Sequence, residues 1–429
     1  MITNYLRYLK ILHTLRNNVW LKTSELEAIQ EKKLRAILNH AYRNVPYYHR
    51  LFDSVGVKPD DIRNIEDLSK IPIITKSQLK NANKEIIARN VDLNNCVECK
   101  TSGSTGMPLT LLFSKEDTPY AGASYERVRI ENGFRLLRDV SLSVGSPYVI
   151  PKGEKKWYQH LGIHRREGLN VFEPLDTQIQ ILKKVKPDAM WGYPSAIKLL
   201  AKAIEEKDIK KVSPRLIFTA SEVLDSETRN FINSVFNVDL FDVYGAYETG
   251  CMAWECDEHV GYHMSVDTVL MEFIDENGEH VNAGERGKVV VTNLHSFAMP
   301  IIRYEIGDFA IPTDEECSCG RGGYLMKAIE GRCDDFIKLP GNKVASPPIL
   351  WSMMKSISGI AEFQVVQEKE DEIVVYVVKM EGAEDSTIFE GIDTEFKKVL
   401  GNNVDIKPKI VKEIAREKSG KLRSVISRL

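Results

Sequence analysis

Apolar residues recur at helical spacing near the start of the chain. Residues 24–27 form an S-E-L-E pattern, typical of a helix-capping box. The apolar positions that follow it at helical intervals are Leu34, Ile37, Leu38 and Ala41. This spacing predicts an amphipathic helix over residues 24–44. Short helical patches with proline breaks come next, so we expect residues 1–80 to form a helical arm packed on the main body.

The pattern changes between residues 140 and 310. Short apolar runs such as VSLSV, AMWGY, RLIFTA and VDLFDVYG alternate with helical stretches such as DTQIQILKKV and SAIKLLAKAIEEK. This alternation predicts a mostly parallel sheet covered by helices. Further on, VLMEFIDENGEHV carries an Asn-Gly turn between two apolar runs, and KVVVTNL follows it. We therefore expect an antiparallel region at the end of the large domain.

The last hundred residues show a third pattern of apolar and polar positions. FQVVQEKEDEIVVYVVKM predicts a hairpin with a charged turn, IFEGIDTEFKKVL a helix, and DIKPKIVKEI another strand. These elements suit a small α+β domain. The expected fold class is α/β, with a large N-terminal domain of mixed sheets and helices and a small, mobile C-terminal domain. The predicted boundaries are 1–80 for the arm, 81–333 for the large domain and 334–429 for the small one.

Bulk composition narrows the classes of function. A chain of 429 residues suggests two or three domains. With 43% hydrophobic residues and a net charge of −3 it lacks the basic surplus of nucleic-acid-binding proteins. Its N-terminus has charges every few residues, unlike a signal peptide, and apolar runs stay below the roughly 18 residues of a membrane span. We expect a cytoplasmic protein that binds neither nucleic acid nor membrane.

Residues 101–108, TSGSTGMP, offer almost no side chain for a core. Glycine, serine and threonine can turn backbone N–H groups and hydroxyls toward one point, which favours a phosphate-binding loop. The same composition describes a flexible surface linker. The segment is not the GTPase and ATPase P-loop, because Lys-Ser/Thr does not follow its second glycine, and the chain has no G-x-G-x-x-G fingerprint.

Seven unevenly spaced cysteines do not make a disulfide framework. Cys256 and His263 are followed by the pair Cys317 and Cys319, and three thiolates with one imidazole suit a closed, structural zinc site. Chance clustering is the alternative, with His259 and Cys251 as substitute ligands. Cys96 and Cys99 could bind metal or be redox-active, but without a second pair nearby we favour two ordinary buried thiols.

Five short motifs occur in a fixed order: TSGSTG at 101–106, DVYGAYETG at 242–250, RYEIGD at 303–308, GRCDDFIKLPG at 331–341 and SGKLR at 419–423. The series resembles the adenylate-forming ligases. The early segment PYYHRLFDSVGV…IEDLSKIPIITKSQL is similar to the phenylacetate-CoA ligase and CapK branch. The resemblance covers nearly the whole chain. It implies a ligase that uses ATP and Mg²⁺ to form an acyl-adenylate and passes the acyl group to coenzyme A.

The resemblance also implies roles for individual residues. The loop Thr101–Gly106 would hold the β,γ-phosphates, Glu248 would bind Mg²⁺, and Asp308 would clamp the ribose. Arg332 would join that clamp, Asp334 would act as the domain hinge, and Lys421 would reach the carboxylate and α-phosphate. The catalytic set is thus Lys421, Glu248, Arg332 and Asp334. The nucleotide-binding set is Thr101, Ser102, Gly103, Ser104, Thr105, Gly106, Ser221, Glu222, Asp242, Tyr244, Gly245, Tyr247, Asp308 and Arg332. In that set Tyr244 and Gly245 would flank the adenine, with Ala220–Glu222 opposite.

The sequence departs from the family at Tyr247, where Thr or Ser usually contacts the α-phosphate. The residue that contacts the α-phosphate and the shape of the adjoining acid pocket are therefore undetermined. Pocket residues are expected near Trp191, Tyr193, Pro194, Ala246 and Tyr247. Their aromatic rings favour a flat acid, although the same rings could be core. Rival hypotheses are an amine, carrier-protein or cofactor acceptor, and a non-catalytic nucleotide-binding relative. The acid itself is not identified, and a homodimer is one option for the oligomeric state.

Overall fold

The structure is a computed structural model of the chain. It describes residues 2–100, 109–147, 157–209, 212–332, 336–339, 343–345, 347–401, 403–417 and 420–429. The chain divides into two compact units, of which the first holds residues 1–306 and 310–329 and the second holds residues 307–309 and 330–429. In the part of the chain that is described, no helix combines the length and apolar character needed to cross a membrane.

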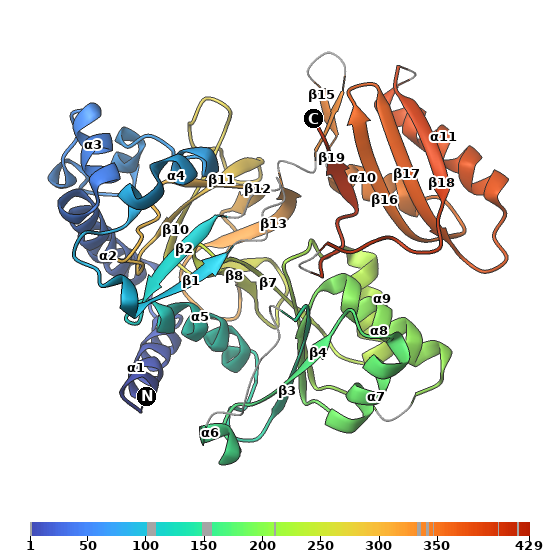
Figure 1. Cartoon of the computed structure of the whole chain (residues 1–429), viewed down its shortest axis with the longest axis horizontal. Coiled ribbons are helices and arrows are strands. Elements are labelled where there is room, and N and C mark those ends of the chain that lie inside the picture. Colours follow the sequence, from blue (N-terminus) through green and yellow to red (C-terminus); the bar gives the residue numbers. More distant parts are fainter. Residues whose placement is uncertain are drawn as a thin grey trace. The chain divides into compact units, whose positions relative to one another are not determined.

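The first unit is built on a long mixed sheet (Figure 1). Among the described residues its strand order is β10-β11-β12-β13-β9-β8-β7-β6-β5-β3-β4. The bounds are β3 Val140–Gly145, β4 Arg165–Asn170, β5 Ala189–Gly192, β6 Leu216–Ala220, β7 Phe241–Ala246, β8 Gly250–Glu255, β9 Tyr262–Met264, β10 Val269–Ile274, β11 Gly287–Asn293, β12 Tyr304–Thr313 and β13 Leu325–Arg332. A separate hairpin pairs β1 (Cys96–Lys100) with β2 (Thr110–Ser114).

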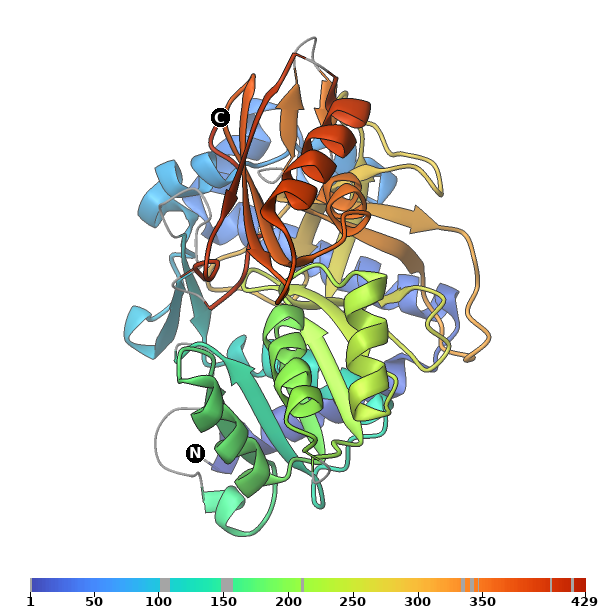
Figure 2. The same ribbon diagram turned by 90° about the vertical axis from the view of Figure 1, so that its right-hand side faces the viewer.

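Strands β4, β3, β5, β6 and β7 run parallel, as the alternating pattern predicts. Their helices are α7 (Leu175–Val185), α8 (Pro194–Glu206) and α9 (Ser226–Phe236), which lie side by side over these strands in Figures 1 and 2. Trp191, Phe218 and Phe241 occupy neighbouring register positions on β5, β6 and β7. Their rings stack with centroids 5.5 Å apart at each step. This stack belongs to the packed core of the parallel half.

The opposite end of the sheet is antiparallel, which confirms the second expectation for this domain. β10 pairs with β11 from Val269↔Asn293 to Ile274↔Lys288. The predicted Asn-Gly turn follows β10, and Gly278 there has φ +85°, a conformation that favours glycine.

The second, third and fourth N-terminal helices pack against the antiparallel half, whereas the first packs against the helix Thr118–Glu131. Helices α1 (Ile2–Asn18), α2 (Thr23–Asn44) and α3 (Pro46–Ser54) are followed by the short α4 (Lys76–Ala82). The predicted helix over 24–44 is confirmed. The prediction that its capping box starts at Ser24 is wrong, because the N-cap residue is Lys22. The helix begins at Thr23, and Glu25 Oε2 accepts a hydrogen bond from the backbone N–H of Lys22 at 3.0 Å. The α2 residues Leu34, Ile37 and Leu38 are buried in the large core.

Among the described residues the first unit has two further helices, and four 3₁₀ turns lie in the arm or just after it. The helices are α5 (Thr118–Glu131) and α6 (Trp157–His160), and the turns are Pro59–Asp61, Glu66–Lys70, Asn83–Ile86 and Leu93–Asn95. Helix α5 contributes the fully buried Arg127, whose Nη1 donates to Asp267 Oδ1 at 2.7 Å. Asn18 of α1 donates to the same carboxylate at 2.9 Å. The two bonds join the arm and α5 to the start of β10.

The second unit is the small α+β fold that the C-terminal pattern predicts. Its main sheet has the order β18-β17-β16-β19, from β16 (Ile360–Lys369), β17 (Glu372–Lys379), β18 (Asp405–Ile410) and β19 (Val425–Ser427). The predicted hairpin, helix and strand are β16–β17, α11 (Asp385–Leu400) and β18. Helix α10 (Pro347–Lys355) and the pair β14 (Ile337–Leu339) and β15 (Lys343–Ala345) precede them. The predicted α/β class with a small C-terminal domain is confirmed, whereas the exact domain boundaries stay predictions.

Candidate active site and metal centre

The DVYGAYETG motif forms a tight antiparallel turn between β7 and β8. Glu248 lies in this turn with 7% of its surface exposed. Its carbonyl oxygen accepts a 2.7 Å hydrogen bond from Asn293 Nδ2 on the end of β11. The neighbouring Tyr247 is 46% exposed. The turn therefore fixes the backbone of Glu248 and supplies a hard carboxylate oxygen, the ligand type that Mg²⁺ prefers.

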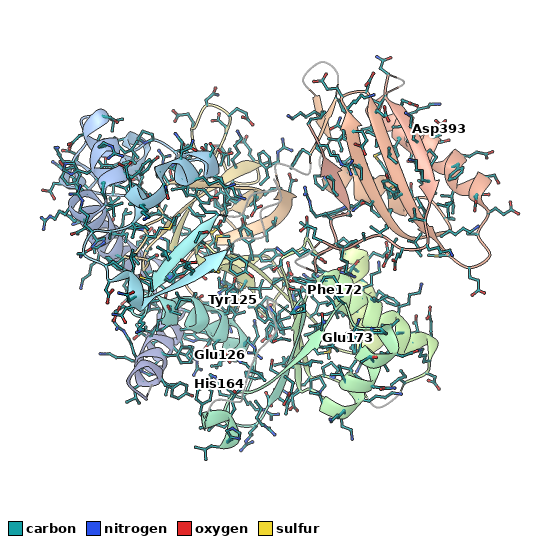
Figure 3. The ribbon with its side chains drawn as sticks, viewed as in Figure 1. Tyr125, Glu126, His164, Phe172, Glu173 and Asp393 are labelled. Atoms are coloured by element: carbon teal, nitrogen blue, oxygen red, sulfur yellow. The ribbon has the colours of Figure 1, made fainter. Side chains whose placement is uncertain are left out.

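Gly245 of the same motif lies against helix α5. A Cβ added to Gly245 would stand 2.2 Å from Tyr125 Oη and 2.7 Å from the carbonyl oxygen of Gly250. Figure 3 labels Tyr125, whose ring also packs edge-on to Trp191 with centroids 5.7 Å apart. The Tyr125 phenol thus fills the space next to Gly245, which is predicted to flank the adenine.

The TSGSTG segment, with its predicted residues Thr101–Gly106, lies outside the described residues. The structure does describe the hairpin around it, because Lys100 of β1 pairs with Thr110 of β2. Cys99 has its thiol pKa raised by burial and by the negative charge of Glu248. The end of β1 therefore lies within electrostatic range of Glu248 in the β7–β8 turn. The phosphate-binding role of the loop and the Mg²⁺-binding role of Glu248 stay predictions.

Ser221 and Glu222 follow strand β6. Ser221 has φ +75°, in the left-handed region that non-glycine residues rarely adopt. The Glu222 carboxylate accepts two hydrogen bonds from Ser195, one from the backbone N–H and one from the hydroxyl, each 3.0 Å long. The two predicted adenine-side residues thus occupy a strained turn that is tied to the start of the preceding helix, α8.

Asp242 is buried in a polar network at the start of the same motif. Its carboxylate accepts hydrogen bonds from Thr219 Oγ1 at 2.5 Å and from the Tyr262 hydroxyl at 2.8 Å. Its backbone N–H donates to Glu255 Oε2 at 2.7 Å. Burial, followed by the Glu255 charge, raises the pKa of Asp242 to about 6. These contacts join β6, β7 and β9, while a role for Asp242 in nucleotide binding stays a prediction.

The remaining predicted residues belong to the second unit or lie outside the described residues. Asp308 lies on β12 and is half-buried, within the three residues that group with the second unit. Arg332 ends β13. Asp334 lies outside the described residues. Lys421 is half-buried, and its carbonyl oxygen accepts a 3.0 Å hydrogen bond from the backbone of Glu417.

Arg303, the first residue of the RYEIGD motif, anchors the start of β12. Its Nε and Nη2 donate to the two carboxylate oxygens of the buried Glu272 at 3.1 and 2.8 Å. Its Nη1 donates to the Ile71 carbonyl at 2.5 Å. This buried pair sets the path of the strand that carries Asp308.

The four predicted metal ligands converge. One ligand atom from each of Cys256, His263, Cys317 and Cys319 lies within 4.8 Å of the others. The Sγ atoms of Cys256 and Cys317 are 3.5 Å apart, and His263 Nε2 lies 3.3 Å from Cys319 Sγ. Ligands of a tetrahedral zinc ion, with Zn–S bonds of about 2.3 Å, stand roughly 3.8 Å apart. The donor set and its spacing therefore fit zinc.

The charge states around this cluster also suit a metal. Burial, followed by the Arg321 charge, lowers the pKa of His263 to about 4, which keeps the imidazole neutral for coordination. Burial opposes ionisation of Cys319, but the Arg321 backbone N–H, 3.4 Å from its sulfur, helps to lower its pKa. The substitute ligands have other contacts: His259 stacks on Phe241, and Cys251 is buried with its sulfur 3.8 Å from the Ala253 carbonyl.

The residues after Cys319 form hydrogen bonds and a cation–π contact with the N-terminal arm. Gly322 donates its backbone N–H to the Val19 carbonyl at 2.9 Å, and Gly323 donates to Thr23 Oγ1 at 3.2 Å. The Arg321 guanidinium lies 4.9 Å from the Trp20 ring centre and 5.3 Å from that of Trp254. A metal held by the four ligands would therefore stabilise the junction of α1 and α2.

Cys96 and Cys99 differ from their prediction. Both thiols are part-exposed rather than buried. They stand three residues apart on β1, so their side chains point to opposite faces of the strand. The predicted acid-side residues Tyr193 and Pro194 are buried, and Trp191 is half-buried in the aromatic stack. Local sequence pattern carries no signal for Tyr125 or Ser195, because their importance rests on long-range contacts.

Comparison with known proteins assigns the chain to a family. The AMP-binding enzyme model matches residues 45–298, and the CapK C-terminal domain model matches residues 338–428. Phenylacetate-coenzyme A ligase of Thermus thermophilus is 28% identical over 85% of this chain and 83% of its own length. Protein CapK of Staphylococcus aureus is 23% identical over 95% of this chain and 90% of its own length.

A solved structure shares the fold. 2-Hydroxyisobutyryl-CoA ligase in complex with R3-HIB-AMP superposes with a TM-score of 0.79 at 20% identity, covering 96% of this chain and 91% of its own. The chain belongs to the AMP-binding enzyme family of adenylate-forming proteins, in the branch of phenylacetate-CoA ligase and CapK.

Proposed function

We propose that this chain is an ATP-dependent acid ligase that forms an acyl-adenylate and transfers the acyl group to coenzyme A. The observation that carries the proposal is the β7–β8 turn, where Glu248 is buried, backbone-fixed and within electrostatic range of the strand that leads into TSGSTG. Its occurrence in a chain of the AMP-binding enzyme family supports the assignment. The proposed acid is aromatic or otherwise small.

In the first half-reaction a carboxylate oxygen of the acid attacks the α-phosphorus of ATP, and pyrophosphate leaves. Catalysis of such a step depends mainly on positioning and charge neutralisation. Thr101–Gly106 would bind the β,γ-phosphates, Glu248 would hold Mg²⁺, and Asp308 with Arg332 would clamp the ribose. Lys421 would supply the cation near the α-phosphate.

In the second half-reaction the coenzyme A thiol attacks the acyl carbon and AMP leaves. Rotation of the second unit about Asp334 would withdraw Lys421 and admit the thiol, so that each half-reaction has its own conformation. Such an enzyme needs a supply of ATP and coenzyme A, so a cytoplasmic location is part of the proposal.

We assign zinc a structural role in this enzyme. Cys256, His263, Cys317 and Cys319 would complete a tetrahedral shell, which leaves no coordination position for a reacting water. Zinc would therefore stabilise the segment between β12 and β13 and its contacts with the N-terminal arm, without taking part in acyl transfer.

Lys421→Ala tests the role of the second unit. An adenylating enzyme should lose acid-dependent pyrophosphate exchange by roughly a hundredfold while it still binds ATP, because Lys421 is proposed to act on the transition state. Lys412→Ala is a matched control, since Lys412 is exposed and precedes the same loop. Equal exchange by wild type and K421A would contradict the proposal.

The acceptor has one specific competitor. The CapK relative covers more of this chain than the Thermus ligase does, and the C-terminal model is that of CapK. An amine, carrier protein or cofactor would then receive the acyl group or AMP. Once an acid supports exchange, adding coenzyme A separates the two: thioester formation favours our proposal, and an adenylate that persists favours the CapK-like alternative.

A further inference from the structure

The side chain of Glu222 is joined to the start of helix α8. Glu222 Oε2 accepts the backbone N–H of Ser195 and Oε1 accepts its hydroxyl, both at 3.0 Å. Ser195 is the second residue of the helix Pro194–Glu206, so its N–H has no acceptor within the helix. A carboxylate is also favoured at this positive end of the helix dipole. Glu222 thus acts as a cap supplied from another element.

The cap holds a strained turn. Ser221, the residue directly before Glu222, has φ +75°, and such a conformation persists only where the surroundings fix it. The turn is bounded on its other side by β6, which pairs in parallel with β5 and β7. With the strand on one side and α8 on the other, the Glu222 carboxylate is a side-chain link that closes the turn.

The link joins two segments with different predicted tasks. Ala220–Glu222 is expected to face the adenine, whereas Trp191–Pro194, directly before Ser195, is expected to lie near the acid. We infer that Glu222 is a positioning residue that holds these two segments in one arrangement and does not itself contact the nucleotide. The inference rests on the proposed function.

The test compares Glu222→Gln, Ser195→Ala and the double variant. Gln keeps the size of the side chain but loses its charge, and Ala removes one of the two bonds. We expect E222Q to weaken ATP binding about tenfold and S195A about threefold, measured by calorimetric titration without acid. The double variant should be no weaker than E222Q, because both changes break one unit. Ser195→Thr, which keeps the hydroxyl, should restore affinity.

Asp225 offers a matched control. It caps helix α9, accepting from the backbone N–H of Thr228 at 2.9 Å and from its hydroxyl at 2.7 Å. Asp225→Asn should lower the melting temperature as much as E222Q does, yet leave ATP affinity unchanged. The same titrations remain informative if no acid supports pyrophosphate exchange, so failure of the proposed function is distinguished from failure of this inference.

Two results would overturn the inference. Weaker ATP binding in E222Q with unchanged binding in S195A, or additive losses in the double variant when both single variants bind more weakly, would make Glu222 a direct nucleotide ligand. Lower melting temperatures with unchanged ATP affinity throughout would leave Glu222 a merely structural cap.

Discussion

Tyr125 Oη occupies the place where Gly245 would carry a side chain, 2.2 Å from the position of an added Cβ. The contact links helix α5 to the end of β7, which leads into the turn that holds Glu248. Burial raises the pKa of Tyr125, so the phenol stays neutral beside this turn. Gly245 is therefore required at this position because the Tyr125 side chain, 120 positions earlier, leaves no room for a Cβ.

Gly245→Ala should displace the turn, because the carbonyl of Gly250 lies as close as 2.7 Å to the new Cβ and cannot move independently. We expect a loss of about 2–4 kcal/mol in the free energy of unfolding, measured by denaturant titration, and loss of ATP binding. Adding Tyr125→Phe should restore part of the stability. Gly122→Ala is the control, since its Cβ would make an ordinary 3.6 Å contact with Tyr8. Equal stability of G245A and wild type would contradict this packing.

Glu248→Gln should abolish the use of Mg²⁺ without unfolding the chain. The amide keeps the shape of the buried side chain but is a weaker ligand for a hard cation. We expect the rate of pyrophosphate exchange at saturating ATP to fall by roughly a hundredfold, with an unchanged melting temperature. Glu279→Gln on the exposed turn after β10 is the control. Full activity of E248Q at limiting Mg²⁺ would place the metal elsewhere.

Metal removal should loosen the N-terminal arm selectively. Purified protein is expected to contain one zinc per chain, and a chelator or Cys317→Ser should remove it. Hydrogen exchange should then accelerate in residues 19–27, which contact the segment after Cys319, and remain unchanged in α11. Cys96→Ser should keep its zinc, since Cys96 lies on β1, away from the four ligands. Full zinc occupancy in C317S, or unchanged exchange after its removal, would refute this role.

Asp242 should make stability fall as the pH rises toward neutrality. Its pKa is raised from 3.8 to about 6, so between about pH 4 and 6 the folded protein keeps a proton that the unfolded chain has released. The contribution of this group is therefore fully favourable below the unfolded pKa and is lost as the pH rises through 6. Its size is at most about 3 kcal/mol.

Denaturant unfolding of wild type and Asp242→Asn over this range isolates the effect, because other titrating groups cancel in the difference. Relative to D242N, wild type should lose stability from about pH 4 to 6 and then stay level. A difference that rises with pH would show that the carboxylate is better stabilised in the folded state than its burial implies.

The elements with a strong period could be predicted from the sequence. Helix α2, the parallel strands β3, β5, β6 and β7, and the β16–β17 hairpin all follow from local pattern. The start of α2 could not, because Ser24 with Glu27 three residues later fits a capping box, whereas the helix begins at Thr23 and pairs Lys22 with Glu25. Local pattern also favoured burial of Cys96 and Cys99, which is wrong, because their exposure depends on how the hairpin lies on the rest of the unit.

The metal cluster was predictable as a set of residue types, but its convergence needed the fold. His263 reaches the cluster because β9 pairs with β8 and β13, and Cys317 and Cys319 arrive from the connection between β12 and β13. Tyr125, Ser195 and Arg321 carried no local signal. Each matters through a contact with a residue far along the chain, which a one-dimensional pattern cannot encode.

The central claim is adenylation, and the most direct test is acid-dependent exchange of labelled pyrophosphate into ATP. The assay should run without coenzyme A across aryl, arylacetic, fatty and amino acids, with K421A and K412A in parallel. We predict exchange with a small or aromatic acid by wild type and K412A, and its loss in K421A. Absence of exchange with every acid, although wild type binds ATP, would contradict the account.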